Sequence, residues 1–109
     1  MAKQQETFTV KERRKPPFLW ISKHVFVLHW HELSDKATRL YVTLCAYADG
    51  DHSGDGVAIA LESLTKRNSM SLSSVHRALR ELEQAGLIGR ERDFDENGVQ
   101  TYTRFILLD

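Results

Sequence analysis

The sequence contains little cysteine and carries neither a long apolar run nor a net charge. Its single cysteine, Cys45, has no partner for an internal disulfide, and it falls on an apolar helix face as a small core residue. No apolar segment approaches the roughly 18 residues of a membrane-spanning helix. The N-terminus lacks the apolar region of a signal peptide. These absences argue against a disulfide-stapled secreted domain and a helical membrane protein, and we expect a cytoplasmic protein.

Charge is balanced in number but unevenly distributed along the chain. The 109 residues include 15 basic and 15 acidic side chains, so net charge alone indicates no particular partner. Basic residues cluster at 11–15 and between 66 and 92, whereas acidic residues gather at 49–55 and 93–96. This segregation is informative because nucleic-acid-binding proteins concentrate their cations on one surface. A hydrophobic content of 41% with 28% charged residues indicates one globular domain.

A stretch rich in glycine and aspartate, ADGDHSGDG at 48–56, raises the question of a calcium site. Asp49 and Asp51 fit the first two ligand positions of a calcium loop, but the closing carboxylate is missing because position 60 is alanine. We interpret the stretch as a polar turn. Three histidines lack a matching cysteine or carboxylate and are interpreted as packing or surface residues: His24, His29 and His31. We expect no metal and no cofactor.

The first half of the chain predicts an arm, an apolar segment, one clear helix and a short strand. Residues 1–17 are expected to form a flexible basic arm that ends at a double proline. Residues 18–33 are apolar and aromatic without a clear period, and we expect an extended start followed by a short turn or helix. Ser34 then caps a helix whose apolar residues repeat every three or four positions, and Gly50 ends it. Residues 57–60 predict a small strand that pairs at the base of the later hairpin.

The second half predicts two helices joined by a tight turn, followed by a hairpin. Residues 61–66 form the first short helix and 67–70 the turn. Ser71 caps the second helix, Gly86 ends it, and its inner stripe contains Leu72, Val75, Ala78, Leu79 and Leu82. Beyond Gly86 the period changes to two, and the Asn-Gly pair at 97–98 predicts a hairpin between strands at 87–94 and 99–108. We therefore predict an α+β fold: a winged helix-turn-helix with a three-helix core, a short strand and a C-terminal β-hairpin wing.

The run SLTKRNSMSLSSVHRALRELEQAGLIGRER, residues 63–92, resembles the winged helix-turn-helix of bacterial DNA-binding proteins. It is most similar to the helix-turn-helix domain of plasmid and phage replication proteins, in which a helix ending near "ADGD" also precedes a small strand and the motif. The segment SLSSVHRALRELEQAGLI also resembles GntR-type repressors. The resemblance covers residues 34–108 and implies binding to double-stranded DNA. One departure is Leu72, where the GntR pattern has an arginine that contacts a base.

The residue types on the outer face of the second helix suit DNA, because a major groove admits one helix that carries small and basic side chains. The candidate contacts on this helix are Ser71, Ser73, Ser74, His76, Arg77 and Arg80. Further candidates lie before it and in the wing: Lys66, Arg67, Asn68, Arg90, Arg92 and Arg104. The wing tip is acidic and is expected to be repelled by phosphate, so the wing arginines nearer its base are the expected contacts.

No nucleophile motif, phosphate loop or pair of catalytic carboxylates occurs in the sequence, so we expect a binding protein and not an enzyme. The first interpretation is a replication initiator or accessory protein of a plasmid or phage. The alternatives are a transcriptional regulator with the same DNA-binding mode and a protein-interaction winged helix in a replication or transfer complex. Residues 18–33 either form a homodimer contact or complete the monomer core.

Overall fold

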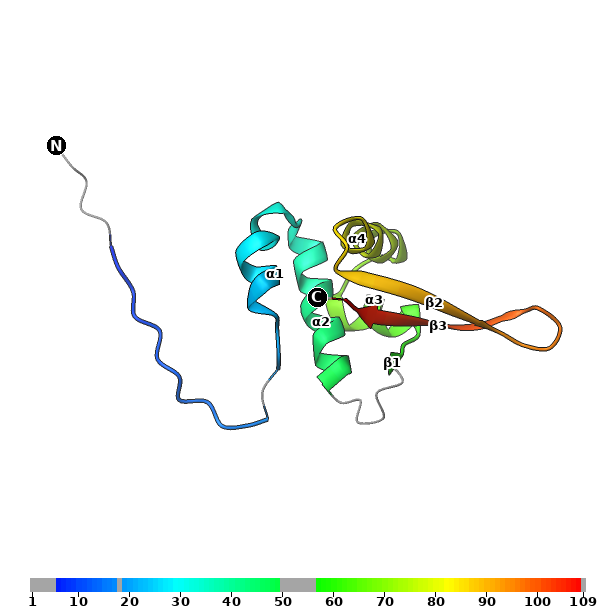
Figure 1. The fold of residues 1–109 in the computed structure, drawn as a ribbon, viewed down its shortest axis with the longest axis horizontal. Helices are drawn as coiled ribbons and strands as arrows, with labels where there is room; N and C mark the ends of the chain where they lie inside the picture. Colours follow the sequence, from blue (N-terminus) through cyan, green and yellow to red (C-terminus); the bar gives the residue numbers. More distant parts are fainter. Residues whose placement is uncertain (1–5, 18, 50–56, 109) are drawn as a thin grey trace.

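The computed structural model of the chain describes residues 6–17, 19–49 and 57–108, without the side chains of residues 49, 57–58, 92–93 and 100–104. The helices are α1 (Lys23–Leu28), a short 3₁₀ helix η1 (Trp30–Glu32), α2 (Asp35–Asp49), α3 (Leu61–Asn68) and α4 (Leu72–Gln84). The strands are β1 (Val57–Ala58), β2 (Ile88–Phe94) and β3 (Gln100–Leu107). Figure 1 shows β2 and β3 extending from the helices as a wing. The predicted winged helix-turn-helix fold is confirmed.

Helix α2 begins where its capping residue predicts. The Ala37 amide donates a hydrogen bond of 3.2 Å to Ser34 Oγ, which satisfies one of the amides that a helix start leaves unpaired. The apolar face of α2 is buried throughout: Ala37, Leu40, Tyr41, Leu44 and Cys45. The predicted end of the helix at Gly50 and the turn at 50–56 lie outside the described residues.

Helix α4 has both predicted ends. Ser71 Oγ accepts a hydrogen bond of 3.1 Å from the Ser74 amide. At the other end Gly86 has a φ of 77°, and the Gly86 and Leu87 amides donate to the last carbonyls of the helix. Its inner stripe is buried at Val75, Ala78, Leu79 and Leu82. The prediction that Leu72 belongs to this stripe is wrong, because its side chain is 51% exposed at the start of the helix.

Helix α3 is longer than predicted, because Arg67 and Asn68 are helical and do not belong to the turn. Asn68 is buried, and its side-chain amide donates 3.1 Å to the Leu64 carbonyl. Thr43 Oγ1 of α2 donates 3.0 Å to Asn68 Oδ1. The Thr43 bond connects the last turn of α3 to α2, and the Leu64 bond holds the Asn68 side chain within α3. Ser69 then takes the left-handed conformation, with a φ of 51°, and reverses the chain towards α4.

The three strands form one antiparallel sheet in the order β1-β3-β2. Val57 of β1 pairs with Phe105 of β3, which confirms that the short strand joins the base of the wing. The predicted hairpin is also confirmed: Asp95 Oδ1 accepts hydrogen bonds of 2.9 Å from the Asn97 and Val99 amides, and Gly98 has a φ of 80°. Leu87, Ile88 and Phe105 anchor the sheet in the core.

The N-terminal segments lie outside this core or at its edge. Residues 6–17 are exposed and contain no helix or strand. Helix α1 buries Val25, while Ile21, Trp30 and Leu33 pack partly buried against the core. The segment 18–33 therefore does contribute to the monomer core, as one alternative predicts, but several of its apolar side chains remain exposed. None of the helices in the described part of the chain has the length and hydrophobicity that crossing a bilayer requires.

The buried bond between Thr43 and Asn68 yields a stability prediction. Replacing Asn68 by alanine removes one acceptor of Thr43, whose hydroxyl keeps the Arg39 carbonyl at 3.0 Å, and the donor to Leu64. We therefore expect the free energy of unfolding to fall by about 1 kcal/mol. Gln84→Ala, at an exposed position of α4, is the matched control and is expected to leave stability nearly unchanged. Urea denaturation followed by circular dichroism measures both variants. Equal midpoints would show that the buried amide contributes nothing.

Candidate nucleic-acid interface

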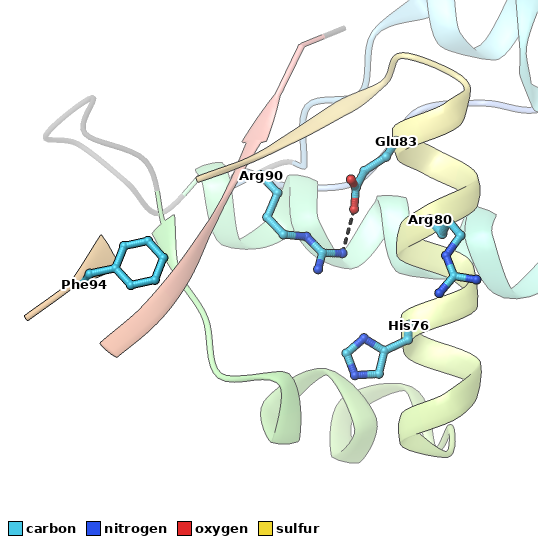
Figure 2. Close-up of a pocket in the computed structure, with 5 residues that line it drawn as sticks. All are labelled: His76, Arg80, Glu83, Arg90 and Phe94. Carbon is cyan, nitrogen blue, oxygen red and sulfur yellow. Dashed lines mark hydrogen bonds and ion pairs between the residues drawn. The ribbon is translucent and has the colours of Figure 1, made fainter. Parts of the chain in front are cut away.

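The outer face of α4 presents small and basic side chains to solvent. Ser73, Arg77 and Arg80 are exposed, and their spacing of four and three residues places them on one side of the helix. His76 is half-buried and turns towards the wing (Figure 2). The buried stripe on the opposite side packs against the core and holds this face in place. The structure therefore brings the predicted arginines of α4 together on one accessible surface.

An open groove of about 610 Å³ lies between α4 and β2. Its lining residues are His76, Arg80, Glu83, Arg90 and Phe94. Figure 2 shows the side chains of His76 and Arg80 extending from α4 at one side, and Phe94 on the wing at the other. The groove contains three basic or titratable nitrogen groups and one carboxylate, so its chemistry suits a polar, anionic ligand.

The wing is attached to α4 by an ion pair inside this groove. Arg90 Nη2 donates 2.6 Å to Glu83 Oε1, and its guanidinium lies 5.5 Å from the ring centre of Phe105. The Arg90 side chain is only 20% exposed, and its Nε is buried without a hydrogen-bond partner among the described residues. Arg90 therefore acts within the domain, by positioning the wing. The sequence instead predicts that Arg90 contacts DNA directly.

Lys36 of α2 places its ammonium group at the N-terminal end of α4, a contact that the sequence does not predict. Lys36 Nζ of α2 donates 3.1 Å to Ser74 Oγ, and Ser74 Oγ also accepts from Ser71 Oγ at 3.0 Å. A second link joins the same two helices, because the Ser34 amide donates 2.7 Å to Glu81 Oε2. Lys36 and Ser74 are 38 positions apart, so no sequence spacing could have paired them.

The three candidates at the end of α3 have different surroundings. Lys66 is exposed and forms an ion pair of 2.9 Å with Glu62 one turn earlier. Arg67 lies over the ring of Tyr47 at 5.7 Å, on the side of α2. Asn68 is buried, and its amide is used by Thr43 and Leu64. Asn68 therefore supports the packing of α3 on α2 and does not reach the surface, contrary to its expected role as a contact.

The remaining wing candidates are placed by their backbone alone. Arg92 pairs with Thr103, and Arg104 pairs with Glu91, in the ladder between β2 and β3. Both side chains lie outside the described residues, as does that of Asp93. At the tip, Asp95 uses its carboxylate to close the turn, and Glu96 is exposed.

Comparison with known proteins agrees with this architecture. A family model described as a helix-turn-helix domain matches residues 31–88. A solved structure of a possible transcriptional regulator from Methanosarcina mazei Go1 is similar in fold, with a TM-score of 0.50 at 15% sequence identity. The match covers 72% of this chain and 58% of the archaeal chain. No curated protein matches this sequence.

The pair of Glu83 and Arg90 can be tested by a double-mutant cycle. Glu83→Ala, Arg90→Ala and the double variant should give a coupling energy of about 1 kcal/mol, since both side chains are partly withdrawn from water. The exposed pair of Glu62 and Lys66 is the matched control, with an expected coupling of about 0.3 kcal/mol. Urea denaturation of all variants provides the energies. A coupling for Glu83 and Arg90 no larger than that of the control would contradict their role in holding the wing.

Proposed function

This chain belongs to the helix-turn-helix domain family, and we propose that it binds double-stranded DNA sequence-specifically, with α4 in the major groove. The observation that carries this proposal is the exposed face of Ser73, Arg77 and Arg80 on a helix whose opposite side is buried. Such a helix offers hydrogen-bond donors in a fixed orientation, which readout of base edges requires. At 13 residues, α4 is long enough, at about 20 Å, to cross the groove.

The side chains of α4 divide into base contacts and phosphate contacts in this proposal. Arg77 and Arg80 read bases or clamp phosphates, because a guanidinium can donate two parallel hydrogen bonds to guanine or to a phosphate. Ser73 is small enough to let the start of the helix approach the base edges. Lys36 and Ser74 lie at the same end of α4 and contact the flanking phosphates.

The groove between α4 and the wing accommodates the DNA backbone in this proposal. His76 and Arg80 face it from α4, while Arg90 keeps the wing at a constant distance through Glu83. Because Glu83 neutralises Arg90, the positive charge of the groove comes mainly from Arg80. The acidic tip of the wing lies farther out and stays away from phosphate.

The basic arm adds affinity that is independent of sequence. Arg14 donates hydrogen bonds of 2.8 and 2.6 Å to the Glu12 carboxylate. These bonds lower the pKa of Glu12 to about 2. Glutamate and arginine are both ionised at neutral pH, so the pair carries no net charge. Lys11, Arg13 and Lys15 remain as the net cations of this exposed segment. Lysines and arginines on such an arm bind phosphates and release counterions.

Two biological roles are compatible with this mode of binding. The first is a replication initiator or accessory protein of a plasmid or phage, which rests on the resemblance of residues 34–108 to the helix-turn-helix domains of such proteins. The second is a transcriptional regulator, and the description of the similar archaeal structure favours it. Sequencing the DNA fragments that the protein selects from its own locus separates them: a replication origin supports the first role, and a promoter supports the second.

We expect Arg77→Ala to weaken binding to the selected DNA site by about 1–3 kcal/mol and to relax preference at one base position. Arg80→Ala should also weaken binding. If Arg80 contacts phosphate, the variant should lose affinity for non-specific DNA as well as for the selected site. Lys66→Ala is the control, because it removes one charge outside α4 and should weaken all sequences about equally. Gel-shift titrations against specific and scrambled duplexes measure these effects. Unchanged affinity for both arginine variants would instead favour the protein-interaction role.

Deletion of residues 1–16 should make the plot of log binding constant against log salt concentration less steep, with a slope smaller in magnitude by about 2–3. Each lost phosphate contact lowers the slope by roughly 0.9, and we expect three to be lost. A full-length variant with Lys11, Arg13 and Lys15 replaced by glutamine should show the same reduction, because charge and not length is responsible. Fluorescence anisotropy at several salt concentrations provides the slopes. Identical slopes for the wild-type and deleted proteins would remove the arm from the interface.

A further inference from the structure

Helix α1 presents an apolar face to solvent. Phe26 is 61% exposed, Val27 68% and Leu28 48%, and Trp20 just before the helix is 69% exposed. Because Phe26 and Val27 follow Lys23 by three and four residues, these three share the side of the helix opposite the buried Val25. Leu28 is exposed too, but it lies on the side of Val25. We call Trp20, Phe26 and Val27 the α1 face.

The α1 face does not belong to the proposed DNA interface. In Figure 1, α1 lies across α2 from β2 and β3. The groove is lined by residues of α4 and β2, with none from α1. The exposed apolar side chains outside this segment are dispersed over the arm, the start of α4, the wing and the end of the chain, whereas the α1 face concentrates three within eight positions. Patches of this kind mark protein interfaces more often than isolated exposed residues do.

We propose that the α1 face packs against the same face of a second copy of this chain, with the two α1 helices antiparallel about a two-fold axis near Val27. Charge complementarity selects this partner and this orientation. Lys23 is exposed at the N-terminal end of the face, and Glu32 is exposed in η1 beyond its C-terminal end. An antiparallel pairing brings Lys23 of each copy to Glu32 of the other, and a two-fold axis makes this contact twice.

The parallel arrangement is disfavoured by the same charges. It would place Lys23 beside Lys23 and Glu32 beside Glu32. Among the described residues, the Glu32 carboxylate lies 4.0 Å from His29 Nδ1 and 3.8 Å from His31 Nε2, which are long distances for an ion pair. It can therefore turn towards a lysine of the second copy without losing a strong bond.

The area of the face is compatible with a weak dimer. With aromatic side chains of about 150–250 Å² each, the three exposed residues offer roughly 300–400 Å² per copy. Two copies together then bury roughly 600–800 Å², which is below the size of a stable specific interface and typical of a weak, transient one. We expect a dissociation constant in the micromolar range, with Phe26 as the main anchor. The resulting pair carries two copies of α4, which lengthens the DNA site that one helix alone would read.

Sedimentation velocity of the full chain without DNA tests the proposal. We expect the wild-type protein to shift from monomer to dimer as its concentration rises. Val27→Asp should abolish the shift, because it places two carboxylates at the centre of the interface. Val99→Asp is the control, since Val99 is similarly exposed, at 59%, but lies on the wing. A wild-type protein that is monomeric throughout, or a control that abolishes the dimer as Val27→Asp does, would overturn the proposal.

A charge exchange tests the orientation at two exposed positions where folding is not at risk. Lys23→Glu and Glu32→Lys should each weaken the dimer about five- to tenfold, because each replaces two attractive contacts by repulsive ones. The double variant should restore wild-type association. Failure of the double variant to recover, or loss of the dimer on deleting residues 1–16, would refute the antiparallel face-to-face contact. Because no DNA is present, these results stand apart from the gel-shift results.

Discussion

The packing of α4 against α2 is the interaction on which the rest of the structure depends. Four side chains, Val75, Ala78, Leu79 and Leu82, bury one side of α4 against the apolar face of α2. Because a helix has 3.6 residues per turn, burying this side exposes Ser73, Arg77 and Arg80 together on the other. Hydrogen bonds from Lys36 to Ser74 and from the Ser34 amide to Glu81 join the start of α2 to α4. The proposed recognition surface is therefore a consequence of the core.

The wing is joined to this core by the buried side chains of Leu87, Ile88 and Phe105 and by an ion pair. Glu83 extends from α4 to Arg90 of β2, and the guanidinium also lies over Phe105 of the core. An arginine that would suit DNA by its chemistry is thus used to hold two parts of the domain together. This use lowers the positive charge of the groove and leaves Arg80 as its main cation.

The two proposed surfaces lie on different parts of the molecule, with α2 between them (Figure 1). One side combines α4 with the wing and is rich in arginine, and the other is the apolar α1 face. This separation allows the chain to contact a second copy while α4 remains accessible. In the apolar segment before α2, Val25 completes the core, while Phe26 and Val27 remain exposed and belong to the proposed contact.

The sequence by itself determined the local elements, because their signals act within a few residues. Ser34 and Ser71 cap helices, Gly86 ends α4 with a left-handed residue, and the Asn-Gly pair marks the wing turn. The outer face of α4 followed from the same periodicity. Only the tertiary structure decided which polar side chains form hydrogen bonds within the domain and not with a ligand. Asn68 bonds with Thr43, 25 positions away, and Arg90 bonds with Glu83. It likewise brought Lys36 to Ser74, because contacts between distant positions depend on how helices and strands pack.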